Sequence, residues 1–85
     1  MERVINFFSD PGHGWARVKR AELIKFGIEN DISTYSYQRG EFAYLEEDCD
    51  LGVYLEALKK HGYTYKFKEY TTNKRSKIRS YAHFV

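Results

Sequence analysis

The amino-acid sequence predicts an α+β fold: a single domain, residues 1–85, in which a small, mostly antiparallel sheet of about five strands carries two helices on one face, in the order β-β-α-β-β-α-β. Three observations support this class. Five stretches are rich in β-forming residues or alternate apolar with polar side chains. One stretch, 50–61, repeats apolar residues at helical spacing. Glycine or the single proline separates most of these stretches.

The first two strands are expected to form a hairpin. Residues 3–9 supply one strand, because they include the β-forming residues Val4, Ile5, Phe7 and Phe8. Residues 10–13 fit a turn, since Pro11 presets φ and Gly12 accepts a positive φ. Residues 15–19 alternate apolar and basic side chains and are expected to be the return strand.

Residues 20–26 are expected to form a short helix of about two turns. Its apolar positions are Ala21, Leu23, Ile24 and Phe26. Gly27 suits the left-handed residue that follows a helix, and Ile28 can then fold back on Leu23 or Ile24.

Residues 34–38 and 41–45 are expected to form a second hairpin, closed by the two-residue turn Arg39-Gly40. In this register one face of the hairpin carries four aromatic rings. The facing pairs are Gln38–Glu41, Tyr37–Phe42 and Tyr35–Tyr44.

Residues 50–61 have the strongest helical pattern in the chain. Their apolar residues recur at i, i+3, i+4 and i+7, at Leu51, Tyr54, Leu55 and Leu58. Asp48 or Asp50 can cap the N-terminus of this helix, and Gly62 can end it.

The last strand is expected at residues 63–70, where aromatic and polar residues alternate strictly. The rings of this strand should pack on the core and leave its lysines in water. The C-terminal tail repeats apolar residues every three positions, which predicts a 3₁₀-like turn docked by its apolar side, at Ile78, Tyr81 and Phe84. Two helices cannot cover both faces of five strands, so a tyrosine-rich sheet face should stay partly open.

Composition indicates the cellular compartment in which the protein is expected. Cys49 is the only cysteine, so no intrachain disulfide forms and a secreted disulfide scaffold is disfavoured. The N-terminus is too short and polar for a signal peptide, and no apolar run approaches the roughly 20 residues of a membrane span. These features predict a cytoplasmic protein.

Charge is unevenly distributed along the chain. The net charge is +2 overall, but residues 41–58 carry six acidic and no basic groups, while residues 59–85 carry eight basic groups and one acidic group. Such segregation predicts either a dipolar surface or two segments that pair in space.

The loop at residues 9–15 is the first candidate binding site. Its two glycines flank His13 and expose backbone N–H groups close to an imidazole and the indole of Trp15, which could hold a phosphate, a carboxylate or a base. The loop matches neither a Walker motif nor a dinucleotide-binding motif. The alternative is a plain hairpin turn with Trp15 in the core.

The acidic run at residues 46–50 is the second candidate. It holds four carboxylates, but adjacent strand residues point to opposite faces, and no histidine stands at a ligand spacing. We therefore expect helix capping and a solvated acidic edge, with no metal and no cofactor. Pairing of this run with the basic tail is the second choice.

The third candidate combines rings and cations. Single-stranded nucleic acid and nucleotides bind where rings stack on bases and cations meet phosphates. The same alternation is also typical of any half-exposed strand. The hairpin contributes Tyr35, Tyr37 and Arg39, and the basic element contributes Lys66, Lys68, Lys74, Arg75, Lys77 and Arg79.

No catalytic residue is predicted, and we expect the protein not to be an enzyme. Cys49 lies among acidic residues, which should raise the pKa of its thiol and blunt its reactivity. No serine, cysteine or histidine stands in a nucleophile motif.

Three long motifs carry a family resemblance. Ser9-Asp10-Pro11-Gly12-His13-Gly14-Trp15, Tyr35-Ser36-Tyr37-Gln38-Arg39-Gly40 and Ala43-Tyr44-Leu45-Glu46-Glu47-Asp48-Cys49-Asp50 resemble small proteins encoded by tailed bacteriophages. The resemblance spans nearly the whole chain. It implies a protein made in the cytoplasm of a bacterial host.

Three hypotheses follow. In the first, suggested by analogy with other small phage proteins, the chain counters a host defence system by binding a host protein or sequestering a small nucleotide. In the second it is a nucleic-acid-binding module, and in the third a small metal-dependent enzyme built on Asp10, His13 and the acidic run. A free sheet edge also makes a homo-oligomer an open alternative.

Overall fold

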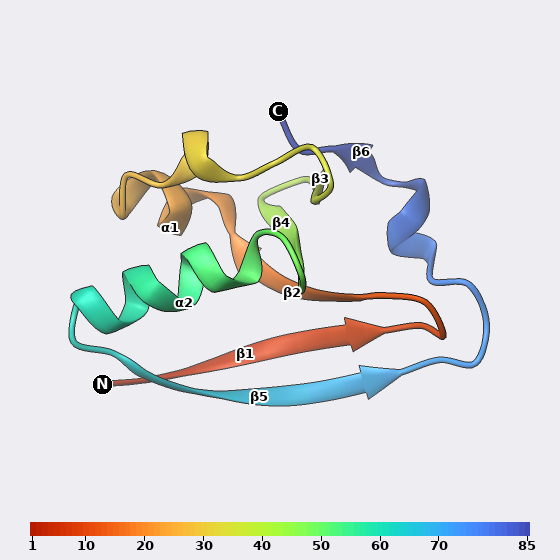
Figure 1. Cartoon of the computed structure of the whole chain (residues 1–85), viewed down its shortest axis with the longest axis horizontal. Helices are drawn as coiled ribbons and strands as arrows, with labels where there is room; N and C mark the ends of the chain where they lie inside the picture. The colour runs from red at the N-terminus through yellow and green to blue at the C-terminus, as the bar shows by residue number, and fades with distance from the viewer.

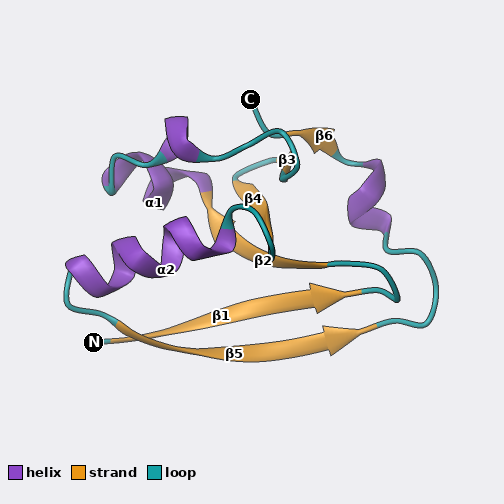
Figure 2. Ribbon diagram, in the orientation of Figure 1, coloured by secondary structure: helices purple, strands orange, loops and turns teal.

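The computed structural model describes the whole chain, residues 1–85, and shows an α+β fold with one six-stranded sheet and two α-helices (Figures 1 and 2). The helices are α1 (Arg20–Lys25) and α2 (Leu51–Lys60), and two 3₁₀ turns are η1 (Glu29–Asp31) and η2 (Lys77–Ser80). The strands are β1 (Glu2–Ser9), β2 (Gly14–Lys19), β3 (Tyr37–Arg39), β4 (Phe42–Glu46), β5 (Thr64–Thr71) and β6 (Ala82–His83). The predicted class is confirmed, with six strands rather than five.

The sheet has the strand order β5-β1-β2-β4-β3-β6 and is mixed. β5 runs parallel to β1 over eight paired positions, and all other neighbouring strands are antiparallel. The arrows of β1 and β5 accordingly point the same way in Figure 1. The expected element order lacked β6, because a strand that pairs with β3 through two residues is too short to produce an alternating pattern.

The register of the second hairpin differs from the prediction. Arg39 pairs with Phe42 and Tyr37 pairs with Tyr44, so the turn is Gly40-Glu41 rather than Arg39-Gly40. Gly40 has φ +59°, which suits the first position of a tight hairpin turn. Tyr35 lies before the strand, is 69% exposed and faces no partner ring. The hairpin therefore carries three of the four expected rings.

The first turn is also built differently. Gly12 does not have a positive φ; instead, the side chain of Asp10 holds the turn. Asp10 Oδ1 accepts hydrogen bonds from the backbone N–H of Gly12 at 2.9 Å and of His13 at 3.0 Å. Gly14 is required by packing, because a Cβ at this position would lie 2.3 Å from Cζ of Phe7.

Both α-helices end as predicted. Gly27 and Gly62 have φ +70° and +79°, and the residues after them, Ile28 and Tyr63, donate backbone hydrogen bonds to the last helical turn. The N-terminus of α2 differs from the prediction, because the Asp50 side chain makes no capping bond. Neither α-helix is long and apolar enough to cross a membrane.

Both α-helices pack on the same face of the sheet. In Figure 2 they lie together above β1 and β5. Leu23 of α1 and three residues of α2 join side chains from β1, β2 and β4 in the main hydrophobic cluster. Tyr63 and Tyr65 pack against this cluster as expected, whereas Phe67, the third ring of that side, is 39% exposed and meets the ring of Phe7. The helix-bearing face is therefore the closed face of the sheet.

A second, smaller cluster covers part of the opposite face. It consists of Trp15, Tyr44 and Ile78, and Ile78 comes from η2. The expected docking of the tail is confirmed for Ile78 and Tyr81, whereas Phe84 joins the main cluster. Because η2 is only four residues long, it covers one end of the face and leaves the rest open.

Candidate functional site

The open face of the sheet carries cations and aromatic rings. The register places Lys68, Asn6, Arg17 and Tyr44 side by side across β5, β1, β2 and β4, and a parallel row contains Tyr70, Phe8 and Trp15. Because paired residues of neighbouring strands point to the same face, these rows share one surface. We call the outward-facing set the basic aromatic face: Phe8, Arg17, Lys19, Tyr37, Arg39, Phe42, Tyr44, Lys66, Lys68 and Tyr70.

Cations and rings are in direct contact on this face. The guanidinium of Arg17 lies 5.3 Å from the ring centre of Phe8 and 4.9 Å from that of Phe42. Phe8 stacks on Tyr70 with ring centres 5.0 Å apart and planes inclined by 14°. At the two ends of the face, Lys68 lies over Tyr70 and Arg39 lies over Tyr81. Such contacts hold the guanidinium and ring planes in place for stacking.

The charge of the basic aromatic face is largely uncompensated. Nζ of Lys66 lies 3.6 Å from a carboxylate oxygen of Glu2. The other four cations of this face make no ion pair, namely Arg17, Lys19, Arg39 and Lys68. No ion pair joins the acidic stretch 41–58 to the basic stretch 59–85. The alternative in which these two stretches pair with each other is therefore not the one that the structure shows.

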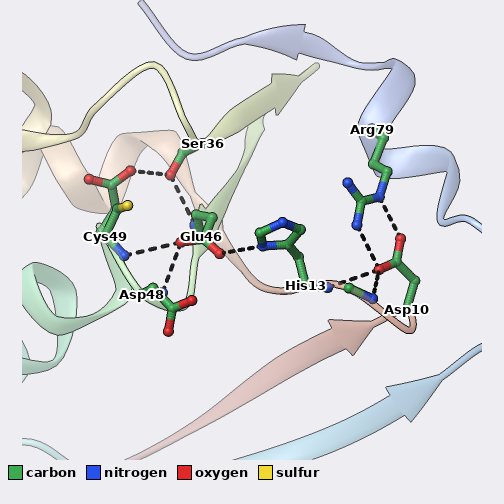
Figure 3. A network of polar contacts seen from close by, with 9 residues as sticks. Asp10, His13, Ser36, Glu46, Asp48, Cys49 and Arg79 are labelled. Carbon is green, nitrogen blue, oxygen red and sulfur yellow. Dashed lines mark hydrogen bonds and ion pairs between the residues drawn. The ribbon is translucent and has the colours of Figure 1, made fainter.

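An ion pair fixes η2 at the border of this face (Figure 3). Arg79 donates two hydrogen bonds to Asp10, from Nε at 2.6 Å and from Nη2 at 2.9 Å, and the Asp10 side chain is only 1% exposed. The Arg79 guanidinium, with backbone N–H donors from Ser76, His13 and Gly12, holds the pKa of the Asp10 carboxyl far below its usual range. In turn, Asp10 raises the pKa of Arg79. Arg79 is thus engaged inside the protein.

Trp15 is also engaged inside the protein. Its side chain is buried, with 1% of the residue exposed, and the guanidinium of Arg79 lies 5.3 Å above its ring. The alternative in which Trp15 belongs to the core is therefore the one that the structure shows. Trp15 supports Tyr37, whose ring meets it edge-on and stacks on His83.

A polar network continues from the first turn to the start of α2 (Figure 3). His13 Nδ1 lies 3.2 Å from Glu46 Oε2, and Glu46 Oε1 accepts hydrogen bonds from the backbone N–H of Asp48 and of Cys49. Ligand atoms of His13, Glu46 and Asp48 lie within 4.8 Å of one another. The third hypothesis combined His13 with the acidic run, and pairing of β2 with β4 is the contact that brings positions 13 and 46 together.

The acidic run is less solvated than expected. Glu46 and Asp50 are buried, and Asp50 accepts hydrogen bonds from the N–H and hydroxyl of Ser33 and from the hydroxyl of Ser36. These bonds attach the loop before β3 to α2. Desolvation and the neighbouring Glu46 carboxylate raise the pKa of the Cys49 thiol, as expected from its acidic surroundings. The thiol is therefore a poor nucleophile, despite its exposure.

The remaining predicted site residues are scattered. His13 is half-exposed at the first turn, and Tyr35 stands alone on the loop before β3. Lys74 and Arg75 lie in the loop after β5, and Lys77 belongs to η2. The structure brings Tyr37, Arg39, Lys66 and Lys68 into the basic aromatic face, and Lys77 lines a cavity at its border with Phe8 and Arg17.

Several residues of the basic aromatic face were not identified from the sequence. Arg17 and Lys19 follow Trp15 at every second position, so all three share a face of β2. The alternation in 15–19 contained this signal, but the sequence did not reveal which face the helices would cover. Comparison of the chain with protein-family models, curated proteins and solved structures finds no match.

Proposed function

We propose that this chain is a non-enzymatic binding module whose basic aromatic face takes single-stranded nucleic acid. The observation that carries the proposal is the placement of five cations among rings on one sheet face, opposite the helices. Four of these rings are exposed or half-exposed, namely Phe8, Tyr37, Phe42 and Tyr70, and Tyr44 is buried. Rings stack on unpaired bases while cations meet the phosphates between them. A duplex hides its base faces, so these rings favour a single strand.

The dimensions of the face favour a strand over one nucleotide. From Lys68 on β5 to Arg39 on β3 the face crosses four strand intervals, or about 19 Å at roughly 4.8 Å for each interval. This distance exceeds one nucleotide and suits a segment of several. A free nucleotide offers the same base and phosphate chemistry, and the binding assay separates the two ligands.

Fluorescence anisotropy with labelled 12-nucleotide DNA and RNA strands, their duplexes and free nucleotides tests the proposal. We expect single strands to bind more tightly than duplexes or nucleotides. The logarithm of the affinity should fall against the logarithm of salt concentration with a slope of about −3, since each phosphate contact contributes roughly −0.7. Tighter binding of duplexes, or an affinity that salt does not change, would refute the proposal.

Charge variants place the binding on the face. Lys68→Gln and Arg39→Gln each remove an exposed cation of the basic aromatic face, and we expect each to flatten the salt slope by about 0.7. Lys60→Gln is the matched control, because Lys60 is exposed at the end of α2, on the closed face. An equal loss in all three variants would indicate that only net charge matters.

The role in countering host defence stays a prediction that rests on the resemblance to phage proteins. Binding of single strands is compatible with it, because a phage protein of this kind can compete for the nucleic acid that a defence system recognises.

A further inference from the structure

The sheet opens between β1 and β2. Their ladder runs from the pair Ser9–Gly14 to the pair Asn6–Arg17 and stops there. β1 nevertheless continues to Glu2 alongside β5, and β2 continues to Lys19 alongside β4. The two strands therefore separate within the sheet, next to the cations of the basic aromatic face.

A cavity of about 430 Å³ occupies this opening, which we call the β1/β2 cleft. This volume falls within the range of small-molecule sites, roughly 300–1,000 Å³. The cleft is lined by both strands, by Phe42 of β4, and by one residue from each α-helix. Its polar and charged lining residues are Arg3, Asn6, Arg17, Lys19, Glu22 and Tyr54.

Hydrogen bonds fix the positions of three residues that line the cleft. Arg3 Nη2 donates to Glu22 Oε2 at 2.7 Å, and the hydroxyl of Tyr54 donates to Glu22 Oε1. Burial and the Glu22 carboxylate raise the pKa of Tyr54, so its hydroxyl keeps its proton and remains a donor. Nε of Arg3 is buried and has no acceptor within the protein. An unpaired buried donor is costly unless something supplies an acceptor.

We propose that the β1/β2 cleft takes one base of the bound strand and selects guanine. This inference rests on the proposed function, because Arg17, Lys19 and Phe42 of the cleft lining also belong to the basic aromatic face. Guanine presents two adjacent acceptors, O6 and N7, which suit arginine and lysine donors. It also presents N–H donors on its pairing edge, and the oxygens of Glu22 and Asn6 are the acceptors that line the cleft.

The same lining disfavours other bases. Cytosine and adenine present an amino group where guanine presents O6, so the amino group would face a cationic donor, Arg3 on the helix side of the cleft or Arg17 and Lys19 on its other side. Leaving buried polar groups unpaired is the most effective way for a site to reject a ligand. Thymine also presents acceptors but lacks N7, which leaves it one acceptor short of guanine.

The edge of the cleft supplies a contact for the phosphate. Lys66 is the β5 partner of Val4, and Val4 is half-exposed at the cleft. The ion pair of Lys66 with Glu2 is exposed at both ends, so a phosphate can replace it at small cost. A base in the cleft thus has a cation beside it for its phosphate.

Nine-nucleotide deoxycytidine strands with one central guanine, adenine or thymine test the inference by anisotropy. We expect the guanine strand to bind about tenfold more tightly than the adenine strand or deoxycytidine alone. Val4→Trp should fill the cleft, and Lys19→Met should remove one donor at its exposed end. Each should reduce the preference for guanine to within about twofold while binding to deoxycytidine persists. Lys74→Met is the matched control, because Lys74 lies in the loop after β5 and outside the cleft.

The outcomes separate the two proposals. Three results would overturn the inference and leave the proposed function standing. They are binding without a preference for guanine, equal affinities for the thymine and guanine strands, and a preference for guanine that persists in both cleft variants. If no strand binds at all, both proposals are overturned. Since Val4→Trp can disturb folding, the exposed Lys19→Met variant keeps the test decisive.

Discussion

Asp10→Asn should be among the most destabilising single substitutions outside the hydrophobic core. Asp10 accepts hydrogen bonds from Gly12, His13, Ser76 and, twice, Arg79, and its side chain is 1% exposed. Asparagine has the same shape, but its NH2 group is a donor and would face N–H groups that now donate to the carboxylate. The substitution also leaves Arg79 without a counter-charge.

The expected cost is about 3 kcal/mol. Removing one partner of a buried ion pair costs roughly 3–5 kcal/mol, and partial exposure of the Arg79 side chain, 25%, places this pair at the low end. For a domain of this size each kcal/mol lowers the melting temperature by about 4–8 °C. We therefore expect Asp10→Asn to melt at least about 12 °C below the wild type.

Urea unfolding followed by tryptophan fluorescence measures this cost directly. Trp15 is the only tryptophan, is buried and lies under Arg79, so its emission reports both global unfolding and the environment of the ion pair. Glu2→Gln is the matched control, because it also neutralises a carboxylate paired with a cation but at an exposed site. Its expected effect is within about 0.5 kcal/mol.

The pH dependence provides a second readout. The pKa of Asp10 is lowered in the folded state, so its contribution to stability is complete above the pKa of the unfolded chain, about 4, and is lost as pH falls below it. The wild type should therefore approach Asp10→Asn in stability below pH 4, by at most about 1.4 kcal/mol for each pH unit. A difference below 0.5 kcal/mol at pH 7, or one that stays constant down to acid pH, would refute the reasoning.

Three further changes test the packing and the thiol. Gly14→Ala should destabilise the fold by about 1–3 kcal/mol in urea unfolding, because its Cβ would lie 2.3 Å from the ring of Phe7; a wild-type midpoint would contradict this. Gly52→Ala should stabilise it by up to about 1 kcal/mol, because nothing lies within 4 Å of a Cβ there and alanine favours the helix; a loss of stability would count against the α2 geometry. Iodoacetamide should alkylate Cys49 more slowly at pH 8 in the folded protein than in urea, because its thiol pKa is raised; equal rates would show that Glu46 has no such effect.

Local patterns predicted most of the secondary structure. Residues 50–61 repeat apolar side chains at helical spacing and residues 63–70 alternate, and both patterns depend only on near neighbours in the chain. The pairing of β5 with β1 was not predictable in this way, because it joins residues about 60 positions apart. β6 forms only because β3 offers an edge to two residues of the tail.

The candidate site was predictable only where it depends on patterns within one strand. Lys66 and Lys68 were identified from alternation within one strand. Arg17 was missed because its importance depends on β2 lying between β1 and β4, where its guanidinium meets Phe8 and Phe42. The roles of Trp15 and Arg79 also depend on tertiary contacts, which bury Trp15 and pair Arg79 with Asp10.

Titration of ¹⁵N-labelled protein with an unlabelled 12-nucleotide single strand, followed by two-dimensional NMR, tests the basic aromatic face most directly. We predict that amide resonances of Phe8, Arg17 and Lys68 shift progressively and saturate together, while those of Glu56, Lys59 and Lys60, on the exposed side of α2, stay within the noise. Shifts concentrated on α2, or an unchanged spectrum with the strand in large excess, would contradict the account.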